Sequence, residues 1–321
     1  MRFVIYGAGA VGGVVGARLH QSGHDVTLIA RGAHLEVMRR DGLTLLTPEE
    51  RAVVRPALAG GPAEVAWHGD EVVLLATKSQ DTAGALAALR DTPGGAAPVV
   101  CLQNGVENER VARRLVDDVY GGVVMAPTAH LEPGVVEAYG ATLSGMIDIG
   151  RYPRGPSPLG PSITAALAEA RFEARAVPDV MRHKHAKLVL NLSNAVDALC
   201  APGPGTEELS ERARSEGRAV LDAAGIDHRA GDVSDLAGRW QRIGVGDIDG
   251  RPRAGSSTWQ SLRRGTPVET DYLNGEIVLQ GALHGVPTPV NRALCRRMAA
   301  VVSAGGPPGS VAADELLAVA A

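Results

Sequence analysis

The sequence predicts an α/β protein in which an N-terminal doubly wound parallel sheet is followed by an all-α C-terminal domain. Short apolar runs alternate with helix-like stretches over the first half of the chain, and a glycine-rich turn directly follows the first apolar run. After Pro178 helical periodicity replaces this alternation. Strand-helix alternation is typical of a parallel sheet that is covered by helices on both faces.

The predicted strands of this sheet are apolar runs bounded by turn residues: Phe3–Tyr6, Asp25–Ile29, Glu71–Ala76, Val99–Leu102 and Gly122–Met125. The predicted helices between them are Val11–Gln21, Ala33–Asp41, Thr82–Arg90 and Asn108–Val116. A hairpin of Val135–Gly140 and Gly145–Ile149, a helix Ser162–Ala170 and a strand Phe172–Val177 are expected to follow.

The second domain is predicted to be helical, with a boundary near residue 178 that gives domains 1–178 and 179–321. Its predicted helices are Val180–Leu199, Thr206–Ala224, Val233–Arg242, Pro267–His284 and Pro289–Ala304. A short alanine-rich helix is expected after the breaker Gly305–Gly309.

Composition excludes several classes of protein. The formal net charge of −4 argues against nucleic acid as a partner. No apolar run approaches the roughly 18 residues that span a bilayer, so no membrane association is expected. The three cysteines lie far apart without CxxC spacing, which predicts neither disulfides nor a metal site. A cytoplasmic location is the simplest expectation.

The glycine-rich turn is a G-x-G-x-x-G match formed by Gly7, Ala8, Gly9, Ala10, Val11 and Gly12. Because a strand precedes it and a helix follows it, the match predicts a Rossmann-type dinucleotide site. Gly7 permits the tight turn, Gly9 lets the pyrophosphate approach the backbone, and Gly12 lets the helix pack closely on the strand. The alternative is a glycine-rich turn that binds no ligand.

Arg31 favours NADP(H) over NAD(H) as the cofactor. The second strand is followed by Ala30 and Arg31, without the acid that would accept a ribose 2′-hydroxyl. A guanidinium at this place can bind a 2′-phosphate through charge-assisted hydrogen bonds. The alternative is that Arg31 is only a solvated charge.

Lys78 and Asn104 each follow a predicted strand of the sheet. Carboxyl ends of strands are where doubly wound folds bind ligands, so both side chains are expected near the nicotinamide half of the cofactor. A purely structural role in a turn stays open for each.

Three polar residues interrupt an otherwise apolar stretch of the first predicted helix of the second domain. Lys187, Asn191 and Asn194 are spaced i, i+4 and i+7, which places them on one helix face. Polar side chains in apolar surroundings need partners or a ligand. The alternative is that the amides bond neighbouring backbone. His183 and His185 are expected to face solvent, and their role stays open.

These motifs together resemble the ketopantoate reductase (2-dehydropantoate 2-reductase) family over nearly the whole chain. The resemblance rests on residues 7–12, Arg31, Thr77-Lys78, Gln103-Asn104-Gly105, Glu132-Pro133-Gly134, Lys187-Leu188 with Asn191, Ser256-Ser257, Glu269 to Gly275, and Gly285 to Asn291. The order and spacing of these motifs carry it, since no single one is decisive.

The resemblance implies reduction of the C2 carbonyl of a 2-oxo acid by NADPH, as in pantothenate biosynthesis, with Lys187 as the general acid. It implies that Asn191 and Ser257 bind substrate and that Asn104 lies between nicotinamide and substrate. Glu269 is implied beside Lys187 and the cofactor ribose. Lys78 and the backbone at Thr128 are implied at the cofactor, and a homodimer is a candidate assembly.

Three positions or segments depart from the family pattern, and the first two reshape the substrate pocket more than the cofactor site. Ala195 stands where the family commonly has a further Asn, residues 200–205 lack another pocket Asn, and Ser261 replaces an acid. A reductase of the same family that takes a different 2-oxo acid is therefore the first alternative. Opine-type or glycerol-phosphate-type dehydrogenases and a non-catalytic NADP-binding sensor are the others.

Overall fold

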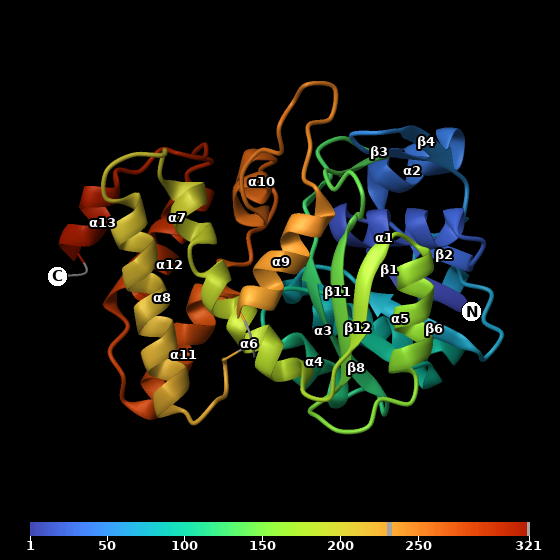
Figure 1. Ribbon diagram of the computed structural model, residues 1–321, viewed down its shortest axis with the longest axis horizontal. Helices are drawn as coiled ribbons and strands as arrows, with labels where there is room; N and C mark the ends of the chain where they lie inside the picture. Colours follow the sequence, from blue (N-terminus) through green and yellow to red (C-terminus); the bar gives the residue numbers. More distant parts are fainter. Residues whose placement is uncertain (230–232, 320–321) are drawn as a thin grey trace. The chain divides into compact units, whose positions relative to one another are not determined.

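The computed structural model describes residues 1–229 and 233–319, and it divides into two compact units (Figure 1). The first comprises Met1–Met181 and Gly231–Arg253, and the second comprises Arg182–Ala230 and Ala254–Ala321. The sequence predicts one boundary near residue 178. The contacts instead place 231–253 with the first unit, so the chain passes from one unit to the other three times.

The first unit is built on an eight-stranded sheet, as the sequence predicts for its Rossmann-type half. Its order is β12-β11-β8-β7-β6-β1-β2-β5. The strands are β1 Arg2–Tyr6, β2 Asp25–Ile29, β5 Ala57–Ala59, β6 Glu71–Leu75, β7 Val99–Cys101, β8 Val119–Met125, β11 Gly145–Arg151 and β12 Phe172–Ala176. Every neighbouring pair is parallel except β8 with β11. Strand order reverses beside β1, and such a switch point is where these sheets bind ligands at their carboxyl edge.

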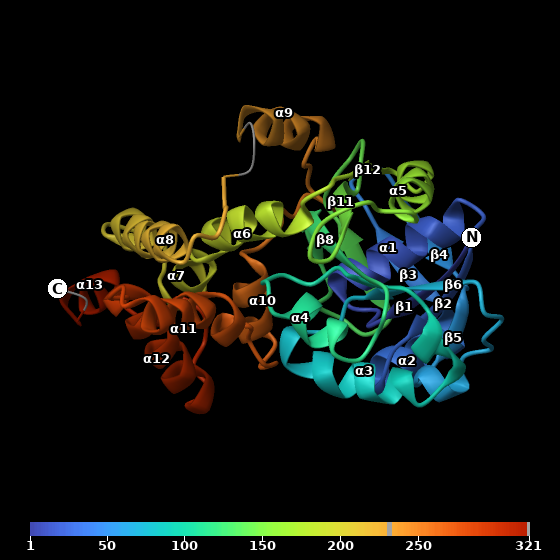
Figure 2. The ribbon, with the colours of Figure 1, turned by 90° about the horizontal axis from the view of Figure 1, so that it is seen from below.

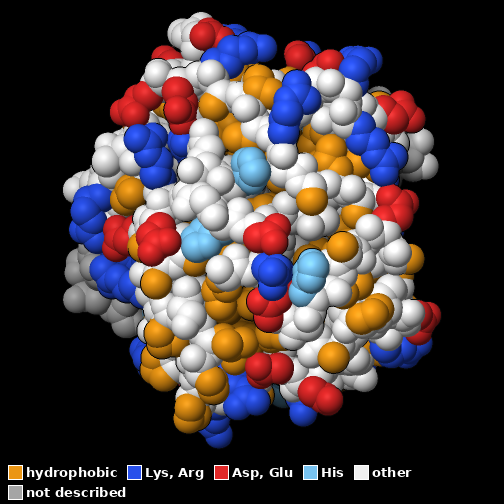
Figure 3. Space-filling view, turned by 90° about the vertical axis from the view of Figure 1, so that its right-hand side faces the viewer, with side chains coloured by type: hydrophobic (Ala, Val, Ile, Leu, Met, Phe, Trp, Pro, Cys, Tyr) orange, Lys and Arg blue, Asp and Glu red, His pale blue; other side chains and the backbone are white. Residues whose placement is uncertain are grey.

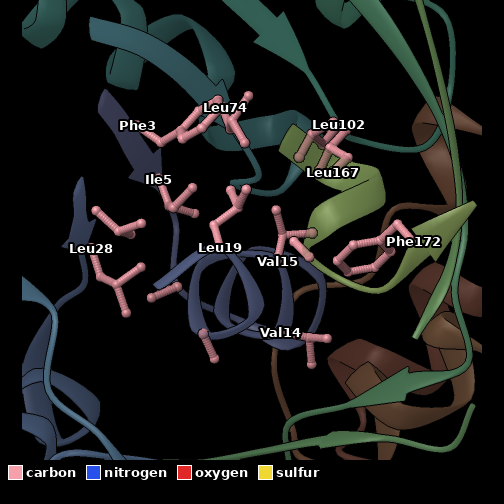
Figure 4. Close-up of a cluster of buried hydrophobic side chains, with 14 of the residues drawn as sticks. Phe3, Ile5, Val14, Val15, Leu19, Leu28, Leu74, Leu102, Leu167 and Phe172 are labelled. Atoms are coloured by element: carbon pink, nitrogen blue, oxygen red, sulfur yellow. The ribbon is translucent and has the colours of Figure 1, made fainter. Parts of the chain in front are cut away.

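Apolar strand residues explain why this sheet is sandwiched between helices. The helices of the first unit are α1 Ala10–Gln21, α2 Gly32–Asp41, α3 Thr82–Arg90, α4 Asn108–Arg113, α5 Gly160–Glu169 and α9 Val233–Ile243. Figure 4 shows Val14, Val15 and Leu19 of α1 beside Ile5 and other strand side chains. These side chains are at most 1% exposed, so the helix that starts at the glycine turn is fixed to the sheet by a dry aliphatic core.

A second sheet corrects the predicted hairpin. Four strands lie in the order β4-β3-β10-β9, with bounds β3 Leu43–Leu46, β4 Arg51–Val54, β9 Thr128–Ala129 and β10 Val135–Ala138. The expected hairpin of Val135–Gly140 with Gly145–Ile149 is wrong, because β10 pairs with β3 and β9 whereas β11 joins the large sheet. Adjacent apolar runs predict strands but not their partners, and Val136 finds its apolar contact on α1.

α9 returns to the first unit although its sequence neighbours belong to the second (Figure 2). Arg239, 2% exposed, donates two hydrogen bonds to Asp148 of β11 at 2.7 and 2.8 Å and one to Glu173 of β12 at 2.7 Å. A bidentate, buried guanidinium pair of this kind is geometrically specific. It fixes α9 at the edge of the sheet.

The second unit is helical. Its helices are α6 Val180–Asn191, which begins in the first unit, α7 Asn194–Leu199, α8 Thr206–Ala223, α10 Ser257–Arg263, α11 Asn274–His284, α12 Pro289–Ser303 and α13 Ala313–Val319. α10 was not predicted, and α11 begins at Asn274 rather than at Pro267, after a short 3₁₀ turn Thr270–Tyr272.

The single helix predicted over Val180–Leu199 is wrong, because it breaks between Asn191 and Asn194. Side chains take carbonyl oxygens near the break. Ser193 Oγ donates to the oxygen of Leu190 at 2.9 Å, and Asn274 Nδ2 donates to that of Leu192 at 2.9 Å. Side-chain competition for backbone groups ends a helix in this way.

Charged side chains of both signs lie on the surface. Figure 3 shows Lys or Arg and Asp or Glu side chains interspersed over one face. Among the described residues, no helix has both the length and the apolar character to cross a membrane.

Candidate active site

The glycine turn of the first unit can accept only glycine at two of its positions. Gly7 has φ +106°, and a Cβ there would lie 2.8 Å from the backbone nitrogen of Thr77. A Cβ on Gly12 would overlap the carbonyl oxygen of Gly7 and lie 2.9 Å from the Ala76 side chain. The glycines therefore bring the turn and α1 close to the end of β6, as the sequence predicts.

Gly9 differs from these glycines, because a Cβ there would meet no atom within 4 Å. It precedes α1, whose first turn carries no acidic side chain and whose first residues, Ala10 and Val11, are partly exposed. Thr77 Oγ1, at the end of β6, is buried without a hydrogen-bonding partner. Open backbone at a helix N-terminus, with a spare hydroxyl nearby, fits an anionic group such as a pyrophosphate.

Arg31 stands at the start of α2, exposed, directly after the end of β2. Its charge acts on the buried Tyr6 hydroxyl at the end of β1, where it opposes the larger effect of burial that raises the Tyr6 pKa. The guanidinium thus lies at the carboxyl edge of the sheet and reaches solvent. That is where the 2′-phosphate hypothesis needs it.

Lys78 and Asn104 occupy two loops that a buried network joins. Asn108 Nδ2 donates to Ser79 Oγ at 3.1 Å and to the Asn104 carbonyl at 2.9 Å, while Asn108 Oδ1 accepts from Thr82 Oγ1 at 2.7 Å. This network fixes the loop after β6 to the loop after β7. The sequence places Lys78 and Asn104 at this edge, but it does not reveal that Asn108 bonds both the Asn104 carbonyl and Ser79, the residue after Lys78.

Thr128 is buried in β9 of the smaller sheet, and Arg253 Nε donates to its carbonyl oxygen at 3.4 Å. Its backbone is held by pairing with Ala138. Its expected role at the cofactor rests on the resemblance alone.

Lys187 of α6 has a lowered pKa. Burial, and to a lesser extent the neighbouring charge of Lys184, lower it to about 7, although the charge of Glu269 acts in the opposite direction. Lys184 is 3% exposed, whereas Lys187 and Glu269 are half-buried. An ammonium that releases its proton near neutral pH, with a carboxylate near enough to act on its charge, is suited to general acid catalysis.

The expected amides and hydroxyl lie on three elements of the second unit. Asn191 ends α6, Asn194 begins α7 and Ser257 begins α10. Asp197 accepts from the Ser256 amide at 2.7 Å, and Ser256 Oγ donates to the Asn194 carbonyl at 3.4 Å. The start of α10 is therefore fixed to α7. The helix break removes the spacing argument for Asn194, whose position depends on this contact instead.

A buried network that the sequence did not reveal supports the break between α6 and α7. Asn274 Nδ2 donates to the Leu192 carbonyl and to Asn291 Oδ1, both at 2.9 Å. Asn291 in turn donates to the Ala213 carbonyl at 3.0 Å and to Glu216 at 2.8 Å. Asn274 and Asn291 are fully buried. The motifs that end in Gly275 and Asn291 thus hold the backbone next to Asn191.

Lysine is rare among the cationic residues of this chain. Lys78, Lys184 and Lys187 are the only lysines among the 32 Lys and Arg of the sequence. Lysine, unlike arginine, can lose its proton in a protein. A titratable cation is therefore rare in this chain, and two of the three lysines lie on α6. His183 and His185, on the same helix, are half-buried rather than solvent-facing.

Two family models match successive parts of the chain. The model described as Ketopantoate reductase PanE/ApbA matches residues 3–154, and that described as Ketopantoate reductase PanE/ApbA C terminal matches residues 179–302. The chain belongs to the ketopantoate reductase family. It is thereby an enzyme of a pyridine nucleotide-dependent oxidoreductase family.

Relatives match over almost their full length. The 2-dehydropantoate 2-reductase of Halobacterium salinarum is 32% identical over 92% of this chain and 96% of its own, and that of Pyrococcus horikoshii is 28% identical over 95% and 99%. A crystal structure of a PanE/ApbA family ketopantoate reductase from Ralstonia eutropha JMP134 has a TM-score of 0.79 and 33% identity, over 95% of this chain and 99% of its own. A D-mandelate dehydrogenase with NADH and anilino(oxo)acetate shares the fold, with a TM-score of 0.78 and 21% identity over 95% and 99%.

Proposed function

We propose that this enzyme reduces 2-dehydropantoate to pantoate with NADPH, and that Lys187 donates the proton. Family membership and the curated relatives named 2-dehydropantoate 2-reductase support the substrate. The observation that carries the mechanism is the lysine whose pKa is lowered to about 7 and whose charge interacts with Glu269.

The fit of the first unit supports a bound dinucleotide. Open backbone at Gly9, the absence of an acid in the first turn of α1 and the orphaned Thr77 hydroxyl suit the pyrophosphate. The exposed guanidinium of Arg31 suits a 2′-phosphate and supports NADPH over NADH. When bound, the nicotinamide supplies the hydride that adds to C2 of the substrate.

Lys187 acts on the oxygen at which negative charge develops. A carbonyl that accepts a hydride becomes an alkoxide, and a cationic donor stabilises that charge and then delivers the proton. The proton leaves Nζ and forms the hydroxyl of the product. Glu269 retains the proton on Lys187 at neutral pH, because it opposes the lowering of the pKa by burial and Lys184.

Polar side chains of the second unit bind the substrate in this proposal. Asn191, Asn194 and Ser257 offer amide and hydroxyl groups to the carboxylate and hydroxyl of the acid. Asn104, in the loop held by Asn108, and Lys78 serve the nicotinamide side. The predicted homodimer and cytoplasmic location stay predictions.

The deciding experiment is an NADPH oxidation assay of the purified chain with 2-dehydropantoate and a panel of 2-oxo acids. We expect kcat/KM for 2-dehydropantoate of at least about 10⁴ M⁻¹s⁻¹, within the usual range for natural substrates. A value below about 10³ M⁻¹s⁻¹ would reject this substrate. If none of the acids in the panel supports NADPH oxidation although NADPH binds tightly, the result would instead favour a non-catalytic sensor.

A same-family reductase for another 2-oxo acid is the second candidate, because the substrate half departs from the family pattern. Ala195, where the family commonly has Asn, is buried and apolar at the start of α7. One amide fewer favours a less polar acid. A panel member with a higher kcat/KM than 2-dehydropantoate would identify that substrate.

A further inference from the structure

His34 of α2 connects the glycine turn with a distant segment of the first unit. Its Nε2 lies 2.8 Å from the carbonyl oxygen of Ala8, and its Nδ1 lies 2.8 Å from the amide nitrogen of Gly134. Both contacts are to backbone, and neither partner is near His34 in sequence. One imidazole thus joins the turn before α1 to the turn before β10.

The two contacts determine the tautomer of the ring. The Gly134 N–H can only donate, so Nδ1 must carry a lone pair. The Ala8 carbonyl can only accept, so Nε2 must carry the proton. His34 is consequently neutral, and burial lowers its pKa in agreement with the geometry.

Close packing keeps the second turn in reach of the ring. Gly134 has φ +76°, and a Cβ there would overlap the side chain of Val37 on α2. In the next strand, Val136 approaches Gly13 of α1 so closely that a Cβ on Gly13 would lie 2.7 Å from it. Residues 134 and 136 therefore pack on α2 and α1, and Gly134 is joined to the glycine turn through His34.

Planarity of the peptide group carries the effect of His34 to the cofactor side. The Ala8 carbonyl and the Gly9 N–H belong to one trans peptide, so they point in opposite directions. A hydrogen bond that fixes the carbonyl toward His34 also fixes the Gly9 N–H away from it. Gly9 is the position of this turn where a Cβ would meet no atom within 4 Å.

We propose that neutral His34 is a positioning residue for the dinucleotide turn, which orients the Gly9 N–H toward the bound pyrophosphate. The inference rests on the proposed function, because it needs a dinucleotide at this turn. Protonation of Nδ1 would turn an acceptor into a donor facing the Gly134 N–H and would release the connection.

His130 is the titratable side chain in contact with His34 from the β9-to-β10 segment, with ring centroids 4.3 Å apart. Its Nδ1 lies 2.9 Å from the Val135 carbonyl oxygen, so it carries a proton there. Arg31 is the charged side chain that precedes α2. The experiment must therefore separate His34 from His130.

NADPH binding is measured by fluorescence titration for the wild type and for His34→Ala, His34→Gln and His24→Gln. His24→Gln is the matched control, a largely buried histidine that packs on Phe3 instead. We expect His34→Ala to raise Kd at least tenfold with kcat at saturating NADPH within threefold, and His34→Gln to restore Kd within threefold. Glutamine carries one donor and one acceptor on a planar group, so it can replace both contacts.

The pH dependence gives a second readout, which holds even if His34→Ala does not fold. Between pH 7.5 and 5.5 the wild type should lose more NADPH affinity than His34→Gln, because only the wild type has an imidazole at position 34 that can be protonated. The 2′-phosphate titrates equally in both and cancels.

Equal Kd for the wild type and a folded His34→Ala, or an identical pH dependence for the wild type and His34→Gln, would overturn the role of His34. If the pH effect is lost in His130→Gln but kept in His34→Gln, the titrating ring is His130 and not His34. Failure of the wild type to bind NADPH would reject the proposed function instead.

Discussion

The two units of this enzyme form their candidate sites by different means. In the first unit the site is mostly backbone: a turn of glycines, a helix N-terminus and loops at the carboxyl edge of a parallel sheet. In the second unit it is mostly side chains on helices, with a perturbed lysine, amides and a carboxylate. The first depends on atoms that must be absent, such as a Cβ on Gly12, and the second on charges that must be present.

This difference follows from the chemistry each unit is proposed to serve. A pyrophosphate has fixed charge and is bound well by N–H groups that cost no reorganisation. A reacting carbonyl changes its charge during the reaction, so it needs a group whose proton can move. Lys187, one of three lysines in a chain otherwise rich in arginine, is proposed to meet that second requirement, because lysine can lose its proton in a protein.

The largest effect is expected from Lys187→Ala. Removal of the proton donor should lower kcat by about 10²–10⁴-fold, while the Kd of NADPH, which depends on the other unit, stays within threefold. Stopped-flow turnover and fluorescence titration measure the two quantities. Substantial turnover in this variant would show that another group supplies the proton.

The corresponding change in the first unit is Gly12→Ala. The added Cβ would overlap the Gly7 carbonyl, so the turn must move and NADPH should bind at least about 100-fold more weakly. Gly84→Ala is the matched control, because Gly84 is in the helix α3 and a Cβ there meets nothing within 4 Å. The control should bind NADPH normally and be slightly more stable, by roughly 0.5–1 kcal/mol. Normal binding by Gly12→Ala would contradict the backbone account.

Arg31 contributes a side chain to the candidate site of the first unit. Its substitution tests whether the enzyme prefers NADPH or NADH. Loss of a charge-assisted contact of about 1.5–3 kcal/mol in Arg31→Gln should weaken NADPH binding about 10- to 150-fold. NADH, which lacks the 2′-phosphate, should bind with little change. Arg39→Gln is a control on the same helix, where the guanidinium pairs with Glu64 at 3.1 Å. If Arg31→Gln loses equal affinity for NADPH and NADH, Arg31 does not recognise the 2′-phosphate.

The same contrast explains what the sequence could predict. The glycine turn, Arg31, Lys78 and Asn104 could be proposed because they follow strands whose apolar runs are visible in the sequence. The strands β1, β2, β6 and β7 lie where these runs predict them. The partner of β10 and the return of α9 to the first unit were not predictable, because both depend on contacts between residues far apart in sequence, such as Arg239 with Asp148.

In the second unit helical periodicity predicts one helix through Leu192 and Ser193. The helix breaks there instead, and Asn274 from a distant segment donates a hydrogen bond to the Leu192 carbonyl oxygen. Lys187 and Asn191 were still found together, since they share α6, whereas the support from Asn274 and Asn291 needs three-dimensional contacts. Local sequence patterns can therefore suggest candidate site residues, but they do not reveal the residues that support them through long-range contacts.

The smallest predicted effect is the pH profile of kcat/KM for the reduction, which reports ionisation in the free enzyme. Only the protonated form of Lys187 can donate, and its pKa is lowered to about 7, so activity should be lost as pH rises through that value. From pH 7 to pH 8 the protonated fraction falls by about fivefold, and above that by about tenfold per unit. Lys187→Arg, which keeps its charge in this range, should remove this limb even where its absolute activity is low. A wild-type profile that stays flat to pH 9 would mean that the site in the second unit does not depend on a titrating lysine. A mobile proton on Lys187 would then not be what distinguishes the second unit from the first.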